Sequence, residues 1–443
     1  LATWLRVERD TLRLNLSGFE YRLTSEMDPP KSIQVSGHTG QMADLEIIGG
    51  RLYSYRAGIG DFADSAGRMR LVGPAMQWRN DREIDVGLDG LGELGIEGGA
   101  SVTTEDIVLG GNEPARGSLW IENGSSLSVQ NQIGVGMMGV GSLLATGGSQ
   151  LESGGAVLGR ENDGHGSAIL QGTGTRWTIF DSLDVGDNGY GLLDVGGHAR
   201  VETMRLNLGR SGSGYGHVLV GGGGVLEAGE IYVGGCERGS GGQGKLEAAG
   251  GGQIVADTLK LWDTGDALRL SGGTVTVRDM WAERGVLDLM DGLLHVQGGS
   301  LRLDDHLSLS GDSPADRPTI RLSGGATLNE GDSFDGNLTI GDDNPAAFEL
   351  LSGSTATVSG EVTLGEEEHG DGRLTVSGYG SALSLRGNLR LGPMGYGELI
   401  VNDGGAVVQE VSPHDTKETN IGGSQNGEGR IAVSGAGSSL TLD

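Results

Sequence analysis

Residues 183–216 read LDVGDNGYGLLDVGGHARVETMRLNLGRSGSGYG, and one pattern occurs twice within this stretch. A leucine-x-valine-glycine step at 183–186 leads through a glycine-rich corner to the segment GLLDV. A leucine-x-leucine-glycine step at 206–209 leads through a similar corner to the segment GHVLV. Repetition at a period of about 25 residues is typical of proteins whose structural units stack on one another.

The glycine that opens each short apolar segment shows how far the repeat extends. Its first seven occurrences follow one another at nearly constant intervals, and the step then returns near the C-terminal end of the sequence. The ten positions are Gly92, Gly117, Gly141, Gly166, Gly191, Gly216, Gly244, Gly372, Gly397 and Gly429. The repeat therefore organises most of the chain, from about residue 67 onward.

Each repeat contains three short segments in which apolar and other residues alternate. In the repeat that opens at Gly191 they are 193–195, 199–201 and 206–208. Alternation with a period of two indicates half-buried β-strands. Diglycine and glycine-x-glycine sequences between the segments favour sharp turns. The 9 prolines of the chain are nearly absent from these segments, as paired strands require.

Three strands in each repeat of about 25 residues predict an all-β fold, a single-stranded β-helix or β-solenoid of about fifteen coils. Coils stacked about 4.8 Å apart would pair each backbone with the coils above and below, which gives an elongated rod. A β-propeller is the other all-β candidate. It fits less well because about nine blades of about 50 residues would be needed, against the usual number of about 4–8.

Composition limits the classes of function. Glycine accounts for 87 of 443 residues, and aromatic residues make up only 4%, which suits a narrow core rather than a large conventional one. The net charge of −29 would repel a nucleic-acid backbone, so nucleic acid is excluded as a partner. The single cysteine, Cys236, excludes a disulfide framework and a multi-cysteine zinc cluster. No apolar run is long enough to predict a transmembrane helix.

The repeat is interrupted in two regions. Residues 1–66 alternate but lack diglycines, and we expect either an N-terminal cap or, preferably, irregular coils. Residues 67–443 form the predicted solenoid array, with irregular coils near 257–333 and a longer acidic loop, SLSGDSPADRP, at 308–318. Because the sequence stops within a coil at Asp443, we expect the chain to be a piece of a longer protein, with an unpaired end that favours end-to-end stacking.

The C-terminal repeats resemble a known group of exported proteins. VSGYGSAL at 376–383 and VSGAGSSL at 433–440 alternate with VNDGGAVV at 401–408. The corner LRLGPMGYG at 389–397 lies between VSGYGSAL and VNDGGAVV. This sequence is similar to the repeat of bacterial autotransporter passengers and PEP-CTERM-type exported proteins. The resemblance covers most of the chain from about residue 67. It implies a right-handed β-helix exposed at a bacterial surface or released from it.

The irregular coils hold the candidate binding residues. Four third strands align on the inward pairs 231/233, 259/261, 280/282 and 307/309. The outward residue between each pair is then Tyr232, Lys260, Trp281 or Ser308. Tyr232, Lys260 and Trp281 could form a strip that binds a sugar or another partner, because aromatic rings suit stacking. Ordinary filling of a sheet surface is the alternative interpretation.

The same alignment suggests two charged groupings. Asp257, Arg278 and Asp305 would form a ladder of alternating charge, which is interpreted as exposed ion pairs. Asp279 beside His306 would form an acid–base pair, the arrangement that a polysaccharide lyase or hydrolase would need on the irregular coils. The alternative is two solvated polar side chains. We assign no catalytic residue.

Acidic corners are the candidates for binding calcium, which prefers several converging oxygen ligands. They are 159–166, 186–191, 340–345 and 365–372. The regular calcium-binding solenoid repeat has an aspartate where this chain has Leu246, so solubilising loops are the preferred interpretation. We therefore expect neither a cofactor nor a metal, with calcium as the alternative.

We expect a non-enzymatic, extracellular or surface-exposed β-helix that acts as an adhesin, a structural fibre or a spacer. Its expected partners are host or matrix glycans or proteins, and further copies of itself through coil stacking. A polysaccharide-active enzyme with its site on the irregular coils is the alternative function.

Overall fold

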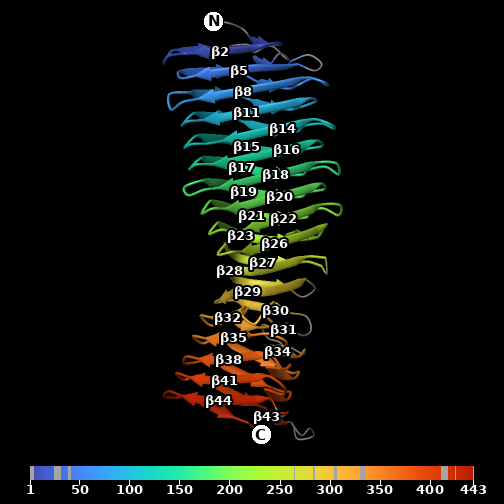
Figure 1. Cartoon of the computed structure of the whole chain (residues 1–443), viewed down its shortest axis with the longest axis vertical. Helices are drawn as coiled ribbons and strands as arrows, with labels where there is room; N and C mark the ends of the chain where they lie inside the picture. The colour runs from blue at the N-terminus through green and yellow to red at the C-terminus, as the bar shows by residue number, and fades with distance from the viewer. Residues whose placement is uncertain are drawn as a thin grey trace. The chain divides into compact units, whose positions relative to one another are not determined.

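The computed structural model describes residues 4–23, 31–37, 41–263, 265–282, 285–303, 307–329, 336–410, 418–424 and 426–442. Every regular element in these ranges is a β-strand, and parallel pairing of strands from successive coils dominates (Figure 1). The predicted fold class is confirmed: the chain is a β-solenoid of about 15 coils. None of the described residues forms a helix long and apolar enough to cross a membrane.

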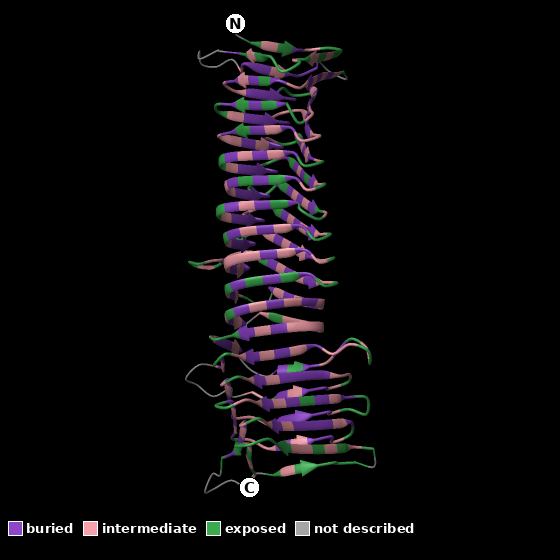
Figure 2. Ribbon diagram, turned by 90° about the vertical axis from the view of Figure 1, so that its left-hand side faces the viewer, coloured by how far each residue is buried: buried purple, intermediate pink, exposed green. Residues whose placement is uncertain are grey.

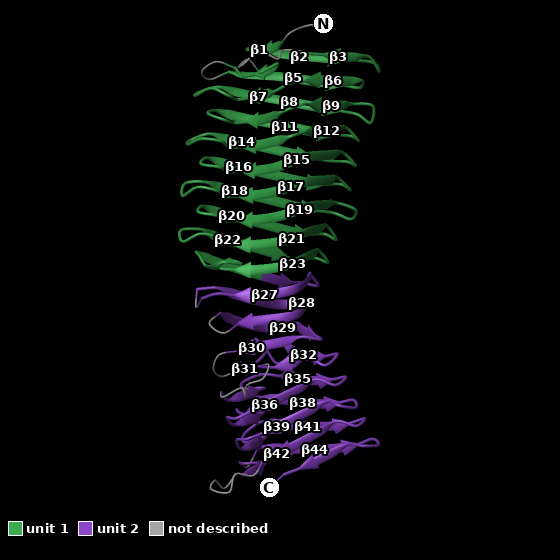
Figure 3. Ribbon diagram, turned by 180° about the vertical axis from the view of Figure 1, so that it is seen from behind, with its two compact units in different colours: residues 1–246 green, residues 247–443 purple. Residues whose placement is uncertain are grey.

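The chain divides into two compact units, residues 1–246 and residues 247–443 (Figure 3). In both units, inward side chains are buried and outward side chains are partly exposed, so burial alternates along the strands (Figure 2). The units are described separately below.

Unit 1 is built from three columns of parallel strands. The first column contains β2 (Thr11–Asn15), β5 (Met42–Ile48), β8 (Ala66–Val72), β11 (Leu91–Glu97), β14 (Arg116–Ile121), β16 (Val140–Thr146), β18 (His165–Gln171), β20 (Tyr190–Gly196) and β22 (Tyr215–Val220). The second begins with β3 (Glu20–Arg22), β6 (Arg51–Ser54), β9 (Gln77–Asn80) and β12 (Ser101–Thr104). The third begins with β1 (Leu5–Val7), β4 (Ile33–Val35), β7 (Ala57–Ile59), β10 (Glu83–Val86) and β13 (Asp106–Leu109).

Farther along unit 1, one long strand covers the second and third sides of each coil. These strands are β15 (Ser126–Val135), β17 (Gln150–Leu158), β19 (Arg176–Val185), β21 (Arg200–Leu208) and β23 (Val225–Val233). Register shifts at the bend, for example between Ile179 and Ser182, allow the strand to turn without a separate loop. A short antiparallel hairpin follows, β24 (Gly235–Cys236) and β25 (Gly239–Ser240), and β26 (Gln243–Ala249) spans the boundary between the units.

The glycine steps stack in register, as the sequence predicts. The paired positions run Gly67, Gly92, Gly117, Gly141, Gly166, Gly191 and Gly216. A Cβ atom at Gly191 would lie 2.2 Å from the backbone nitrogen of Gly186 and 2.6 Å from the carbonyl oxygen of Leu158. Gly186 itself has a φ of 71°. The corner therefore needs one glycine for its backbone conformation and a second for lack of space.

The earliest strands of unit 1 also pair in parallel with the coil that follows. β1 pairs with β4, β2 with β5 and β3 with β6. The strand position of Gly67 is occupied by Ala43 one coil earlier. The described residues before 67 thus continue the same three columns without the regular glycine spacing.

Unit 2 begins with short coils. Its strands are β27 (Gln253–Leu261), β28 (Ala267–Ala282), β29 (Val286–Gln297) and β30 (Ser300–Leu303). β28 covers all three sides of one coil, because it pairs first with β29 and then with β30. Leu268 pairs with Leu287, whereas in unit 1 the strand that holds Gly191 pairs with the one that holds Gly216. The chain therefore returns to the same side of the solenoid sooner in these coils than in the regular coils of unit 1.

The order of the columns then changes within unit 2. Leu294 pairs with Val275 of β28 on one side and with Ile320 of β32 on the other. The column of glycine-step strands therefore continues from the second strand of the short coils. It comprises β32 (Thr319–Ser323), β35 (Ala346–Leu351), β38 (Asp371–Ser377), β41 (Tyr396–Asn402) and β44 (Glu428–Ser434).

The other two columns shift accordingly. β33 (Thr327–Leu328) continues from β30, followed by β36 (Thr355–Val358), β39 (Ala382–Leu385), β42 (Ala406–Gln409) and β45 (Ser439–Thr441). A separate sheet begins with β31 (Leu307–Leu309) and continues with β34 (Leu338–Ile340), β37 (Val362–Leu364), β40 (Leu389–Leu391) and β43 (Thr419–Ile421).

This change corrects the alignment of one coil. The sequence pattern placed Leu307 and Leu309 above Met280 and Ala282, but the structure places Leu301 and Leu303 there. Leu307 instead starts the new sheet and pairs with Leu338. The alignment was wrong because it assumed a constant order of the sides, whereas one extra strand enters the coil that follows β30.

Candidate functional site

The predicted strip of outward residues is divided between the units. Tyr232 lies in β23 of unit 1, beside Arg205 and Glu230, which form an ion pair of 3.1 Å. Burial raises the pKa of the Tyr232 hydroxyl, and the carboxylate of Glu230 acts in the same direction. Lys260 and Trp281 lie in unit 2, where they are direct partners in adjacent coils.

The aromatic rings near Lys260 and Trp281 are in contact with cations. The Lys260 Nζ lies 3.6 Å from the ring centroid of Trp262, and the Arg302 Cζ lies 5.7 Å from the ring centroid of Trp281. Arg302, rather than Ser308, is the outward residue that follows Trp281. Lys260 and Trp281 are therefore neighbours, as predicted, and the binding role of the strip stays a prediction.

The charged groupings of the irregular coils are only partly described. Asp305 and His306 lie outside the described residues. The Asp279 Oδ1 accepts hydrogen bonds from the backbone nitrogen and the hydroxyl of Ser300, at 3.0 and 3.3 Å, and its Oδ2 lies 3.1 Å from Arg278. The Asp279 carboxylate of β28 thus holds the first residue of β30 in place through hydrogen bonds, which is a structural role.

The acidic corners of the predicted calcium sites differ in their contacts. At 186–191, the Asp187 Oδ1 accepts a hydrogen bond of 2.8 Å from the Ser211 hydroxyl of the next coil. At 365–372, burial and the neighbouring carboxylate of Asp342 raise the pKa of Glu366. Within the residues that the structure describes, no three His, Cys, Asp or Glu side chains are arranged to hold one metal ion.

Two neighbouring polar pockets on unit 1, which we together call the corner groove, were not anticipated from the sequence. The groove lies where the second strand of each coil turns toward the third. One part has a volume of about 750 Å³ and is lined by Arg22, Leu23, Tyr53, Ser54, Tyr55, Arg79 and Asp81. The adjoining part, of about 270 Å³, shares Arg79 and Asp81 and adds Asn80, Thr103, Thr104, Glu105, Ser128 and Gln130.

The parallel register brings the groove residues together. Arg22 of β3 pairs with Tyr53 of β6, which pairs with Arg79 of β9. Arg79 pairs with Thr103 of β12, which pairs with Ser128 of β15. These five residues occupy the same outward position in successive coils. One wall of the groove is therefore a single column of side chains along the stacking direction.

Charged side chains at the groove are held in pairs. The Arg22 Nη2 lies 2.7 Å from Glu20, the Arg79 Nε lies 3.0 Å from Asp81, and the Arg82 Nη1 lies 3.1 Å from Glu105. Two of these guanidinium groups also contact aromatic rings. The Arg22 Cζ is 4.2 Å from the centroid of Tyr53, and the Arg82 Cζ is 5.7 Å from the centroid of Tyr55.

A buried polar network supports the floor of the groove. The Trp78 indole donates to the Ser54 hydroxyl at 2.8 Å, and that hydroxyl donates to the Asn80 side-chain oxygen at 2.7 Å. The Asn80 amide donates to the Thr104 hydroxyl at 3.1 Å, which in turn donates to the Arg82 carbonyl oxygen at 2.6 Å. Satisfied buried networks of this kind hold their members in one arrangement.

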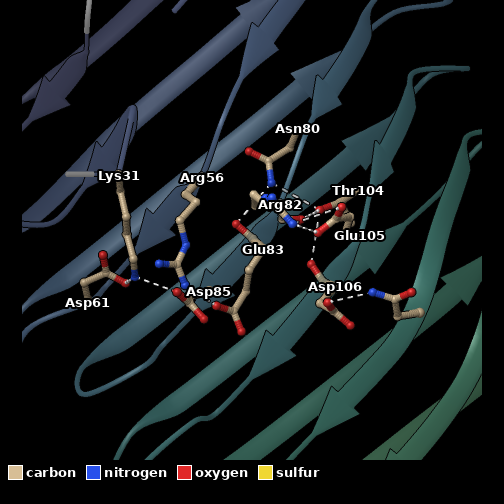
Figure 4. A network of polar contacts seen from close by, with 11 residues as sticks. Lys31, Arg56, Asp61, Asn80, Arg82, Glu83, Asp85, Thr104, Glu105 and Asp106 are labelled. Atoms are coloured by element: carbon tan, nitrogen blue, oxygen red, sulfur yellow. Dashed lines mark hydrogen bonds and ion pairs between the residues drawn. The ribbon is translucent and has the colours of Figure 1, made fainter. Parts of the chain in front are cut away.

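A second network lies beside the first, on the third column (Figure 4). The Lys31 Nζ contacts Asp61 at 2.7 Å and Asp85 at 2.6 Å, and both carboxylates are almost fully buried. Burial raises the pKa of both aspartates, while the Lys31 ammonium acts in the opposite direction. Arg56 and Glu83 form an ion pair of 2.7 Å next to this cluster. The wall of unit 1 is thus cross-linked by side chains from successive coils.

The alternation of buried and outward residues in the second strands is the sequence signal that could have indicated the groove. In Arg51–Ser54 and Gln77–Asn80, the outward positions carry Tyr53 and Arg79. They belong to coils that precede most of the regular glycine steps, so their register was not assigned. Searches among protein-family models, curated proteins and solved structures found no match to this chain.

Proposed function

We propose that the chain is a non-enzymatic binding scaffold, displayed at a bacterial surface or released from it, which acts as an adhesin or a structural fibre. Two features support the cellular setting. The repeats resemble those of autotransporter passengers and PEP-CTERM-type exported proteins, and the fold is the β-solenoid that the resemblance implies. The strongly acidic surface, with a net charge of −29, also suits an exported protein that must remain soluble.

The corner groove is the observation that carries the binding role. Its wall is formed by one outward column, Arg22, Tyr53, Arg79, Thr103 and Ser128, so it crosses successive coils. A groove that follows the stacking direction fits an extended partner better than a compact small molecule. Because the coils stack in register, each one contributes a side chain of its own to such a partner, from Arg22 to Ser128.

Rigidity of the groove supports binding over catalysis. Its floor is held by the hydrogen bonds among Trp78, Ser54, Asn80 and Thr104, so little ordering is needed when a partner binds. Its carboxylates, Asp81 and Glu105, are each paired with an arginine. Both carboxylates are thus already engaged in ion pairs, which suits a role in orienting a bound partner.

A binding assay on the whole chain tests the proposal. The immobilised protein is exposed to soluble polymers, matrix proteins and bacterial cells, and retained material is measured together with any products of cleavage. We expect binding without turnover, and loss of binding in Arg79→Ala. Arg386→Ala is the matched control, because Arg386 is also exposed and ion-paired, with Glu410 at 2.9 Å, but lies in unit 2. Cleavage of a polymer, or equal binding by both variants, would contradict the proposal.

A further inference from the structure

The charges that line the corner groove balance one another. Arg22 and Arg79 contribute two positive charges, and Asp81 and Glu105 contribute two negative ones. The whole chain, in contrast, carries a net charge of −29. An acidic polymer would be repelled by the protein as a whole and would find no excess of positive charge in the groove. A strongly basic polymer would be attracted to the whole surface rather than to this site.

The polar groups in the groove suit hydroxyl groups. Each arginine–carboxylate pair places several N–H donors next to carboxylate acceptors. Neighbouring hydroxyl groups on a sugar ring can both donate and accept, and so can use both members of a pair. The hydroxyls of Thr103 and Ser128 and the amide of Gln130 continue this lining into the adjoining part of the groove.

Tyr53 and Tyr55 add apolar surface to the same lining, with the Arg22 guanidinium already lying over the Tyr53 ring. A tyrosine combines a flat apolar ring with a hydroxyl at its tip, so it can contact a ligand that has one apolar face and a hydroxylated edge. A pyranose ring has this character. The tyrosines and the ion pairs therefore match the same class of ligand by different chemistry.

The corner continues with exposed apolar side chains in later coils of unit 1. Phe180 and Met204 lie at the register shift between β19 and β21, where the second side turns into the third. Phe180 is 59% exposed and Met204 is 67% exposed. An extended chain that leaves the groove along this corner would meet further apolar contacts.

The backbone around the groove argues against a peptide partner. An extended peptide usually adds to an unpaired strand edge, through main-chain hydrogen bonds. Here β6 pairs with β3 and β9, and β12 pairs with β9 and β15, so these strands have no free edge at the groove. Recognition must therefore depend on side chains.

From these observations we infer that the corner groove binds an uncharged, hydroxyl-rich polysaccharide chain lying along the stacking direction. This inference rests on the proposed function, since it assigns the ligand class of the same groove. The arginine–carboxylate pairs orient the hydroxyl groups, and Tyr53 and Tyr55 contact the apolar faces of the sugar rings.

The test compares neutral and acidic polysaccharides in solution. Calorimetric titrations use a dextran, a mixed-linkage β-glucan and a galactomannan as neutral probes, and polygalacturonate and hyaluronan as acidic ones. We expect binding of at least one neutral probe, with little dependence on salt because no counterions are released. Tyr53→Ala should weaken it by about tenfold or more. Arg79→Ser should also weaken it, whereas Arg386→Ala should leave it unchanged.

The outcomes separate this inference from the proposed function. Binding of only the acidic probes, sensitive to salt and to Arg79→Ser, would overturn the neutral ligand class while leaving the groove as a binding site. Binding of a neutral probe that neither Tyr53→Ala nor Arg79→Ser weakens would overturn both proposals for the groove. Retention of proteins alone would overturn the assignment to polysaccharides. Far-ultraviolet circular dichroism of each variant establishes that the solenoid is intact.

Discussion

The coils of residues 91–220 in unit 1 and those of residues 267–328 in unit 2 differ in how they bring successive strands into register. In unit 1, each coil opens with a glycine that stacks on the glycine of the previous coil, and the steps between these glycines are nearly constant. In unit 2, Leu268 pairs with Leu287 after a shorter stretch of chain. Leu294, on the second side of a short coil, then pairs with Ile320 of β32, which belongs to the column of glycine-step strands.

The difference shows which part of a coil sets the repeat. Inward residues such as Leu193 and Leu268 are buried in both regions, so the strands are interchangeable. The corners are not. In the regular coil residues 197–199 separate β20 from β21, whereas β28 bends within one strand, where the register shifts near Ser271 and Gly272 has a φ of 82°. Corner length therefore sets the period, and an additional strand changes which columns continue.

Deleting part of a coil should have the largest effect on the regular region. Removal of residues 166–190 places Gly191 where Gly166 stood, and the observed register keeps all inward residues inward. Removal of residues 166–179 leaves one coil short of a strand, with unpaired backbone groups on both neighbouring coils. We expect a cooperative thermal transition for the first variant and loss of cooperativity or aggregation for the second. In unit 2 the matching whole-coil deletion is shorter and removes residues 267–285, because Ala267 pairs with Val286.

Circular dichroism melts and sizing chromatography measure these outcomes. Similar behaviour of the full and partial deletions in unit 1 would contradict the coil register. Failure of the whole-coil deletion in unit 2, alongside success of the whole-coil deletion in unit 1, would show that the short coils are not independent repeats.

Adding a single methyl group to the glycine column should have the next largest effect. In Gly191→Ala, the new Cβ would meet backbone atoms of the corner and of the previous coil at 2.2–2.7 Å. Because backbone cannot give way as a flexible side chain can, we expect a loss of about 3 kcal/mol or more. Gly212→Ala is the control, since its Cβ has no atom within 4 Å. Calorimetric melting of both variants measures the effect, and equal stability would show that the stacked glycines are replaceable.

Acidification should change the stability of the regular coils through a buried aspartate. Burial raises the pKa of Asp184 above its ordinary value of 3.8, although Asn207 and Arg210 act in the opposite direction. Protonation then favours the folded state: the contribution is complete below the pKa of the unfolded chain and is lost as the pH rises through the higher folded pKa. The melting temperature of the wild type should therefore fall more steeply between acidic and neutral pH than that of Asp184→Asn. Parallel curves for the two proteins would rule out this role.

A pair of cysteines can test the corrected register with little effect on stability. Trp281 and Arg302 occupy adjacent strands, which are about 4.8 Å apart, within the range that a disulfide can span. In a Cys236→Ser background, Trp281→Cys with Arg302→Cys should cross-link under a mild oxidant. Trp281→Cys with Ser308→Cys should not, because Ser308 pairs with Thr339. Mass spectrometry distinguishes the products, and cross-linking of only the second pair would restore the alignment drawn from the sequence.

The residues of the candidate site show which neighbours the alternation of the sequence predicts and which it misses. Lys260 and Trp281 were correctly expected to be neighbours, because both lie next to inward leucine or methionine residues in successive coils. Arg22, Tyr53 and Arg79 were not recognised as one column, although Tyr53 and Arg79 alternate with buried neighbours in their own strands. The stretch of chain from Arg22 to Tyr53 is longer than the stretch from Tyr53 to Arg79, because the corners differ in length, and no regular glycine marks their register.

The sequence by itself determined the all-β solenoid, the three sides of each regular coil and the stacking of the glycine steps. These features depend on local sterics and on a period of two, which each segment of chain carries independently of the others. Only the tertiary structure decided the corner groove, the burial of Asp61 and Asp85 around Lys31, and the shift of columns after β30. These depend on which side chains become neighbours in adjacent coils, and that is set by the lengths of the intervening corners rather than by any one segment.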